Sequence, residues 1–214
     1  MNAVDLSSLR KDYSLKTLSK SSVSPDPFQQ FSIWFDEART AKLIEPNAMT
    51  LSTVDAHCRP SSRVVLLKRF DNSGFTFYTN YESKKGRELA ANPHCSLHFF
   101  WSALERQAII LGEATKTTRD ESEAYFNSRP LASRLGAWVS RQSSAIESRE
   151  ILDAEFEKLK VEFDGKTIPL PPFWGGFRVV PNRFEFWHGR ANRLHDRICY
   201  EPANEEWKLF RLSP

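Results

Sequence analysis

Basic side chains stand beside apolar stretches at several places in this sequence, in patterns that could bind anions. SRVVLLK places Arg63 and Lys68 at the two ends of four apolar residues. YESKKGR places Lys84 and Lys85 near the start of an expected helix, where positive charge opposes the helix dipole. A bound phosphate would compensate that charge and accept hydrogen bonds from the free N–H groups of the first turn. A core strand with charged ends and a solvated basic turn are the alternatives.

Two spacing patterns bear on how such groups could converge. Side chains alternate along a strand, so Arg63 and Lys68 should face opposite ways and contact different groups, unless a bulge intervenes. Tyr125, Arg129 and Ser133 are spaced by four, and a continuous helix would place them on one face. The proline after Arg129 leaves the continuity of that helix open.

The stretch NRLHDR places two arginines, a histidine and an aspartate within six positions. In an extended strand Arg193, His195 and Arg197 would point to one side, and Leu194 and Asp196 to the other. Three groups that can be cationic repel one another unless an anionic or electron-rich group lies against them. An exposed strand with scattered counter-charges is the alternative, but aromatic residues flank the stretch and make full exposure less favourable. We therefore predict a ligand site here, with no role for Asp196.

Other chemistries find less support in the sequence. His94 and His98 in HCSLH would share a strand face, but a metal needs three or four converging ligands and no partner pair stands elsewhere. We therefore predict no metal site. The three cysteines are an odd number with no CxxC pair, which favours a reducing compartment over a disulfide framework. The usual glycine-rich phosphate loops are absent, so side chains must hold any bound phosphate.

Composition indicates an ordinary globular protein. The chain has 214 residues, of which 40% are hydrophobic, 27% charged and 13% aromatic. The net charge of +3 is too small to indicate nucleic-acid binding, although anionic small ligands fit it. No stretch approaches the roughly 18 apolar residues of a membrane span, and the N-terminus lacks the apolar core of a secretory signal. We predict a cytoplasmic protein with no nucleic-acid or membrane partner.

The elements that carry these residues are expected to be short strands, mostly antiparallel, with helices at the edges. Asp26 and Pro27 suit the cap and the first position of a helix, and TRDE at 118–121 has the form of a capping box. The apolar side of the helix at 148–163 would consist of Ile151, Leu152, Phe156 and Leu159.

The expected helices and strands make one domain over 26–214, with α+β, mainly β, barrel-like architecture. Residues 1–25 are polar and rich in serine, and we predict that they form a mobile segment. Helices are expected over 27–43, 82–92, 118–128, 132–140 and 148–163. Strands are expected over 48–55, 62–70, 75–80, 94–101, 106–117, 177–181, 183–189, 194–202 and 206–212.

Taken in order, RVVLLK, FYTN…SKK, ERQ, YFNSRP, GAWVSRQSS, PPFWGGFRV, FEFW and RLHDR resemble the motifs of the pyridoxamine (pyridoxine) 5′-phosphate oxidases. The resemblance runs from residue 9 to the end of the chain; each motif alone is weak, but the ordered set is specific. It implies the FMN-binding split β-barrel with flanking helices, assembled as a homodimer with FMN at the subunit interface. It also implies that residues 1–25 can cover the active site.

The resemblance further implies two ligands that each carry a phosphate. For FMN it implies contacts from Arg63, Val64, Val65, Leu66, Leu67, Lys68, Tyr78, Thr79, Lys84, Lys85, Gln107, Gln142, Ser143, Trp187 and Arg197. For the substrate it implies contacts from Arg10, Tyr13, Lys68, Tyr125, Arg129, Ser133, Arg193, Leu194 and His195. Arg193 and His195 would be catalytic, and Arg63, Lys84 and Lys85 would hold the FMN phosphate. The family often has arginine in place of Lys84, and a lysine lacks the planar guanidinium fork.

The implied reaction belongs to vitamin B6 biosynthesis and salvage. Pyridoxamine or pyridoxine 5′-phosphate would lose a hydride from C4′ to the flavin and become pyridoxal 5′-phosphate. O2 would be the final acceptor, with H2O2 as product and with ammonia released from the amine substrate. A split-barrel reductase for another substrate is the nearest alternative, and the implied substrate-phosphate residues argue against it. A non-catalytic carrier of FMN or pyridoxal phosphate is a further alternative, and Arg193 with His195 argues against that one.

Overall fold

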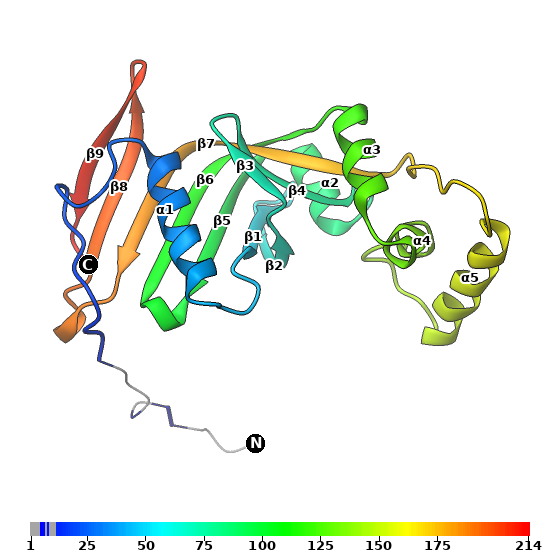
Figure 1. Ribbon diagram of the computed structural model, residues 1–214, viewed down its shortest axis with the longest axis horizontal. Coiled ribbons are helices and arrows are strands. Elements are labelled where there is room, and N and C mark those ends of the chain that lie inside the picture. Colours follow the sequence, from blue (N-terminus) through cyan, green and yellow to red (C-terminus); the bar gives the residue numbers. More distant parts are fainter. Residues whose placement is uncertain (1–4, 7, 9–11) are drawn as a thin grey trace. The chain divides into compact units, whose positions relative to one another are not determined.

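The computed structural model describes residues 5–6, 8 and 12–214. This part of the chain forms five α-helices and nine strands (Figure 1). The helices are α1 (Pro27–Thr40), α2 (Lys84–Ala91), α3 (Arg119–Ser128), α4 (Leu131–Val139) and α5 (Arg149–Glu162). The strands are β1 (Ala48–Val54), β2 (Pro60–Leu66), β3 (Arg69–Asp71), β4 (Gly74–Asn80), β5 (His94–Trp101), β6 (Arg106–Lys116), β7 (Trp174–His188), β8 (Asp196–Ala203) and β9 (Glu206–Leu212).

Hydrogen bonds connect the strands in the order β2-β1-β5-β6-β7-β4-β3, and β8 pairs with both β7 and β9. By its contacts the chain divides into two compact units, neither of which is continuous in sequence. Unit 1 comprises the described residues up to Asn47, with His98–Ile110 and Asn182–Pro214. Unit 2 comprises Ala48–Leu97 and Leu111–Pro181.

The core of unit 1 is aromatic. The antiparallel strands β7, β8 and β9 supply one part of it, including Phe184, Phe186 and Tyr200, which are fully buried. Helix α1 supplies Phe31, whose ring lies 5.0 Å from that of Phe99, and Trp34, whose ring lies 5.1 Å from that of Phe186. Large rings therefore fill this core through edge-to-face contacts, which explains part of the high aromatic content.

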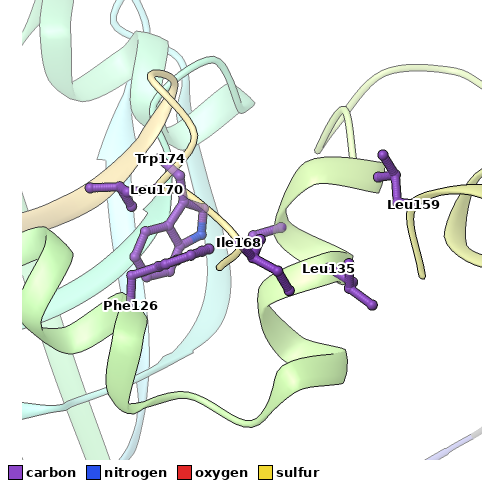
Figure 2. Packing of buried hydrophobic residues seen from close by; sticks show 7 residues of the cluster. Phe126, Leu135, Leu159, Ile168, Leu170 and Trp174 are labelled. Atoms are coloured by element: carbon purple, nitrogen blue, oxygen red, sulfur yellow. The ribbon is translucent and has the colours of Figure 1, made fainter. Parts of the chain in front are cut away.

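Unit 2 contains a second apolar cluster that joins its helices to the start of β7. Phe126 of α3, Leu135 of α4 and Leu159 of α5 belong to it, together with Trp174 at the start of β7. Figure 2 shows their side chains with Ile168 and Leu170, which come from the segment that precedes β7. This packing holds the end of α3 and the start of α4 in place. Predicted site residues lie at these two helix termini.

Local signals for helix ends are confirmed. The Asp26 carboxylate accepts the Phe28 N–H at 2.9 Å, and Pro27 is the first residue of α1. Thr118 and Glu121 form a reciprocal capping box at the start of α3, and Ser83 caps α2. These signals are reliable because each depends only on neighbouring backbone groups.

The strand predictions need correction where side-chain pattern alone had to set a boundary. The expected strand 62–70 ends at Leu66 and resumes as β3, so the alternation from Arg63 to Lys68 does not apply. The expected strands 177–181 and 183–189 form one continuous strand, β7. Pro181 does not interrupt it, because the φ of proline is compatible with β structure and only one N–H donor is lost. The strand expected from Leu194 begins instead at Asp196.

One expected core position is also wrong. Ile151, assigned to the apolar side of α5, is 49% exposed, whereas Leu159 is buried. In the structure α5 packs on α4 mainly through its second half, so the first-turn isoleucine lies outside the contact.

Gly86 in α2 should not tolerate a side chain. A Cβ there would lie 2.1 Å from the carbonyl oxygen of Tyr81, which is backbone and cannot rotate away. We expect Gly86→Ala to lower the free energy of unfolding by about 1–3 kcal/mol, as overpacking does. Gly136 in α4 is the matched control, because a Cβ there would meet nothing within 4 Å. Gly136→Ala should raise stability by about 0.5–1 kcal/mol. Urea denaturation of both variants checks this, and equal effects would contradict it.

Candidate functional site

The residues that the sequence nominated fall into two groups, one in each unit. Unit 2 holds Arg63, Val64, Val65, Leu66, Leu67, Lys68, Tyr78, Thr79, Lys84, Lys85, Tyr125, Arg129, Ser133, Gln142 and Ser143. Unit 1 holds Tyr13, Gln107, Trp187, Arg193, Leu194, His195 and Arg197. Arg10 lies outside the described residues.

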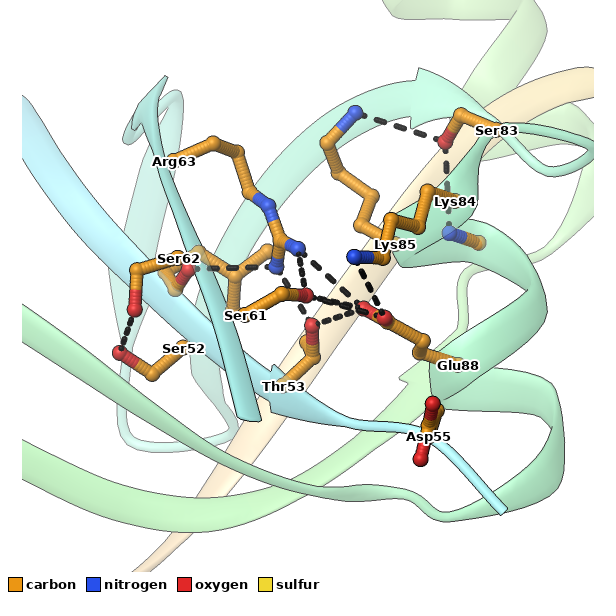
Figure 3. A network of polar contacts seen from close by, with 12 residues as sticks. Ser52, Thr53, Asp55, Ser61, Ser62, Arg63, Ser83, Lys84, Lys85 and Glu88 are labelled. Carbon is orange, nitrogen blue, oxygen red and sulfur yellow. Dashed lines mark hydrogen bonds and ion pairs between the residues drawn. The ribbon is translucent and has the colours of Figure 1, made fainter. Parts of the chain in front are cut away.

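Arg63 lies at the centre of a polar network that joins β1, β2 and α2 (Figure 3). The antiparallel register pairs Leu51 with Arg63 and Thr53 with Ser61, which brings these side chains together. The guanidinium donates to the Leu51 carbonyl at 3.2 Å and to the hydroxyl oxygens of Thr53 and Ser61. Its orientation is thus fixed by groups on two strands before any ligand is present.

Glu88 of α2 provides a counter-charge to this network. Its carboxylate lies 3.2 Å from Arg63 Nη2 and 3.8 Å from Lys84 Nζ, and its side chain is only 4% exposed. Burial by itself would raise the pKa of Glu88, but hydrogen bonds from Thr53 and Ser61 and the charge of Arg63 hold that pKa below its ordinary value. The carboxylate therefore stays ionised and orients Arg63.

Lys85 lies among neutral oxygen atoms. Its Nζ donates to Gln142 Oε1 at 2.6 Å, to Thr79 Oγ1 at 3.2 Å and to Ser83 Oγ at 3.4 Å. Burial, and then the positive charge of Arg63, lowers the pKa of Lys85 to about 8, against the opposing effect of Glu88. A dianionic phosphate beside Arg63 and Lys85 would relieve the repulsion between these two cations.

Binding of a phosphate ligand should therefore depend on pH through Lys85. Below pH about 8 the ammonium is already protonated and the affinity should be constant. Above that pH the free protein has lost the proton that the complex retains, so the affinity should fall by up to about tenfold per pH unit. Fluorescence titrations with FMN between neutral and alkaline pH measure this.

Lys85→Arg is the control for this prediction, because a guanidinium remains protonated throughout the range. This variant should bind with an affinity that varies less with pH. A wild-type affinity that stays flat across pH 8 would contradict the role assigned to Lys85.

A cavity of about 230 Å³ opens next to this cluster in unit 2. Its lining residues include Asn80, Arg129, Ser133, Gln142 and Trp174. The Arg129 guanidinium lies 4.7 Å from the centre of the Trp174 ring. Its buried Nη1 has no hydrogen-bond partner within the described part of the chain. Such an unpaired cationic donor is costly to bury and suits an anionic ligand group.

The spacing of Tyr125, Arg129 and Ser133 does not correspond to one helix. Helix α3 ends at Ser128, Arg129 is its cap residue, and α4 begins after Pro130. Arg129 and Ser133 nevertheless both line the cavity. Tyr125 stacks on Tyr78 with ring centres 3.9 Å apart, and the Tyr78 ring in turn lies parallel to that of Trp174. The break between the helices thus aims two of the three residues into one cavity.

The remaining nominated residues of unit 2 have varied surroundings. Val64 is 68% exposed, whereas Leu67 is buried beyond the end of β2. Lys68 is exposed, and its backbone N–H donates to the Thr76 carbonyl at 2.9 Å. Ser143 is exposed, with a φ of 72° in the segment after α4.

In unit 1, two aromatic rings lie against His195. The imidazole lies 4.7 Å from the Trp187 ring and 5.8 Å from the Tyr13 ring. The Arg190 N–H donates to His195 Nδ1 at 3.1 Å, so Nδ1 is an acceptor and carries no proton. In the neutral ring the proton must be on Nε2, which is then the nitrogen that can donate to a ligand.

The cationic strand face predicted for NRLHDR does not form. Arg193 lies in a short 3-10 turn with a φ of 60°, and only Arg197 lies on a strand. Arg197 makes a bidentate ion pair with Glu185 at 2.7 and 2.9 Å. Its charge is thus balanced within the protein by a carboxylate on the neighbouring strand.

The histidine pair predicted not to bind metal has other partners. His98 Nε2 lies 2.9 Å from Gln107 Oε1, which places that nominated glutamine on β6 beside β5. His94 lies 3.7 Å from a Glu113 carboxylate oxygen. No group of three or more potential metal ligands occurs among the residues that the structure describes. In the same residues, no helix is long and apolar enough to cross a membrane.

Sequence reasoning missed several residues that orient the nominated ones. Glu88 could have been found, since it lies four positions after Lys84 on a helix. Thr53, Ser61 and Glu185 could not, because their contacts depend on strand register.

Comparison with known proteins places the chain in a family. A family model described as pyridoxamine 5′-phosphate oxidase matches residues 35–162. Another, described as the pyridoxine 5′-phosphate oxidase C-terminal dimerisation region, matches residues 174–214. A pyridoxine/pyridoxamine 5′-phosphate oxidase of Gloeothece citriformis is 53% identical over 210 residues, with 98% of each chain covered. One from Cupriavidus necator is 54% identical over 211 residues, covering 98% of this chain and 99% of the relative. The chain belongs to the pyridoxamine 5′-phosphate oxidase family.

Solved structures agree on the fold. PhzG from Burkholderia lata, in complex with tetrahydrophenazine-1-carboxylic acid, superimposes with a TM-score of 0.88 at 29% identity, covering 95% of this chain and all of that one. A pyridoxamine 5′-phosphate oxidase-related, FMN-binding protein from Nostoc punctiforme gives a TM-score of 0.72 at 16% identity, covering 90% of this chain. The predicted α+β, mainly β split-barrel fold is confirmed.

Proposed function

We propose that this protein is a flavin-dependent oxidase that converts pyridoxamine and pyridoxine 5′-phosphates into pyridoxal 5′-phosphate. The observation that carries the proposal is the pair of neighbouring anion sites in unit 2. Lys85 donates to Gln142, and Gln142 also lines the cavity that contains Arg129. Two phosphorylated ligands can therefore bind side by side, as a phosphorylated cofactor and a phosphorylated substrate require.

The donors of the Arg63 network fit the FMN phosphate. Arg63 offers a planar guanidinium already oriented by two strands, and Lys84 and Lys85 offer ammonium groups at the start of α2. When bound, FMN would accept a hydride from the substrate C4′ and pass the electrons to O2, which gives H2O2. Val64 to Leu67, Tyr78, Thr79, Gln107, Gln142, Ser143, Trp187 and Arg197 remain the proposed contacts of the flavin.

The substrate phosphate is proposed to bind in the Arg129 cavity, with Ser133 as a hydrogen-bond donor. Lys68 and Tyr125 are proposed to contribute from the neighbouring segments. The pyridine ring would lie against Arg193, Leu194 and His195, with His195 Nε2 directed at the C4′ substituent. Arg10 and Tyr13 would cover this ring, as part of a segment 1–25 that closes over the site.

The match of residues 174–214 to a dimerisation region supports a homodimer, and we propose that FMN binds at its interface. A cytoplasmic location, with no nucleic-acid or membrane partner, stays a prediction from the sequence.

Oxidation of a different reduced ring is a second candidate, because the structure of PhzG holds a tetrahydrophenazine carboxylic acid. The identity to that protein is 29%, against 53% for the oxidase of Gloeothece citriformis. Arg129 lines the cavity, and its buried Nη1 has no hydrogen-bond partner among the described residues, which also favours a phosphorylated substrate.

A direct assay tests the proposal. The purified protein should take up FMN and show a flavin absorption spectrum. Addition of pyridoxine 5′-phosphate in air should yield aldehyde and H2O2 in equal amounts, whereas unphosphorylated pyridoxine should react poorly because it cannot use Arg129. Protein that binds no FMN, or that oxidises both compounds equally, would refute the proposal.

A further inference from the structure

Residues 12–18 have no helix or strand, yet a buried carboxylate holds their backbone in unit 1. Glu105 Oε2 accepts the Ser14 N–H at 2.9 Å and the Leu15 N–H at 3.1 Å. Glu105 is only 3% exposed and adopts a φ of 55°, which a residue other than glycine or asparagine seldom adopts without a reason. It belongs to the ERQ motif, in which the resemblance implied a role for Gln107 and none for Glu105.

A second anchor holds Leu18 by both of its backbone polar groups. Asp196 Oδ2 accepts the Leu18 N–H at 3.0 Å, and Arg211 Nη2 donates to the Leu18 carbonyl at 2.7 Å. Asp196 and Arg211 also form an ion pair with each other. The Leu18 side chain is buried, so the segment is fixed by apolar packing as well. Figure 1 shows this N-terminal segment beside β8 and β9, which carry the two charged residues.

The anchors place the Tyr13 ring against the side chains of Trp187 and His195. The ring meets the Trp187 and His195 rings edge to face at 5.7 and 5.8 Å. It also lies on Gly189, where a Cβ would come within 2.5 Å of the Tyr13 ring. The Glu105 carbonyl accepts the Gly189 N–H at 2.8 Å. Glu105 therefore holds both the tyrosine segment and the surface on which the tyrosine packs.

We infer that Glu105 and the Asp196–Arg211 pair are positioning residues that dock residues 13–18, so that Tyr13 closes the His195 side of the substrate site. The inference rests on the proposed function for the identity of that substrate. This inference assigns a role to Asp196, for which the sequence indicated none. The Asp196 carboxylate holds the N-terminal segment, whereas the adjacent His195 contacts the Tyr13 and Trp187 rings.

Trypsin measures the docking independently of activity. Lys16 lies between the two anchors and Lys20 follows them, and both are exposed. Cleavage after either lysine requires the segment to leave its anchors. Loss of two hydrogen bonds to a buried carboxylate should make cleavage of FMN-loaded Glu105→Ala about tenfold faster or more. Asp196→Ala should behave alike, whereas Glu105→Gln keeps an acceptor oxygen and should stay near wild type.

Glu201→Ala is the control, since it breaks the Arg183–Glu201 ion pair of the same unit without touching the segment. Its cleavage rate and kinetics should match wild type. In Glu105→Ala the KM for pyridoxine 5′-phosphate should rise about fivefold or more while kcat changes less, because closure contributes binding to substrate and transition state alike.

These measurements test the docking of residues 13–18 separately from the proposed oxidase function. Unchanged trypsin cleavage in both alanine variants would overturn the docking role, and faster cleavage with an unchanged KM would overturn its link to substrate. If the wild-type protein oxidised no pyridoxine 5′-phosphate, the proposed function would fail, and the cleavage rates would still decide the docking.

Discussion

Arg63→Ala should reduce FMN affinity by about a hundredfold or more, since it removes charge-assisted hydrogen bonds each worth about 1.5–3 kcal/mol. The variant should also be less stable. Loss of the Arg63 guanidinium leaves the Glu88 carboxylate, which is 4% exposed, without its nearest cation. Breaking one partner of a buried ion pair costs about 3–5 kcal/mol. Fluorescence quenching of FMN and thermal unfolding of the free protein measure the two effects.

A double variant separates these two effects. Arg63→Met with Glu88→Gln removes both charges and leaves groups of similar volume, so stability should return most of the way to wild type. FMN affinity should stay low, because the guanidinium is still absent. Recovery of FMN binding together with stability would mean that Arg63 serves the fold and does not hold the phosphate.

His195→Ala should lower kcat by about a hundredfold while FMN remains bound, a loss typical of a positioned proton-transfer or polarising group. The reason lies in the ring orientation: Nδ1 accepts the Arg190 N–H, which leaves Nε2–H for the substrate. The contacts that orient Arg63 and Lys85 come from Leu51, Glu88 and Gln142 and not from His195, so the phosphate donors should be unaffected. Stopped-flow reduction of the bound flavin and its absorption spectrum report the two properties.

His195→Asn is the informative comparison. The asparagine carbonyl can replace Nδ1 as acceptor for Arg190 N–H, but nothing replaces Nε2. If turnover depends on Nε2, His195→Asn should be as slow as His195→Ala, with a better-preserved fold. Restoration of turnover by asparagine would show that the residue acts only by holding the turn, and loss of FMN from either variant would count against the assignment.

Much of the fold could be read from local chemistry. The caps at Asp26 and Thr118 were predicted because each satisfies backbone donors a few residues away. The boundaries of the strands were harder to predict, because side-chain alternation says where a strand could continue and not whether it does. Thus β2 ends at Leu66, and β8 starts only at Asp196.

The candidate site, like the fold, was predictable from the sequence only in part. Residue type and spacing were enough to select Arg63, Lys85 and Arg129 as candidate anion-binding residues. The family resemblance then implied which ligands they bind, namely FMN and a phosphorylated substrate. The tertiary structure decided what each cation contacts: Arg63 pairs with Glu88, and Arg197 pairs with Glu185. Arg129 lines a cavity, and its buried Nη1 has no partner in the part of the chain that the structure describes.

The sequence by itself determined the family, the starts of α1 and α3 and the residue types of the site, because these depend on local pattern. Only the tertiary structure decided that the charges of NRLHDR have separate partners. Asp196 and Arg197 meet Arg211 and Glu185 on other strands, and His195 meets the Tyr13 ring. These contacts join residues 12 to more than 180 positions apart. Strand pairing, which no local pattern encodes, brings Arg197 to Glu185 and Asp196 to Arg211, and the hydrogen bonds from Glu105 and Asp196 to residues 14–18 bring Tyr13 to His195.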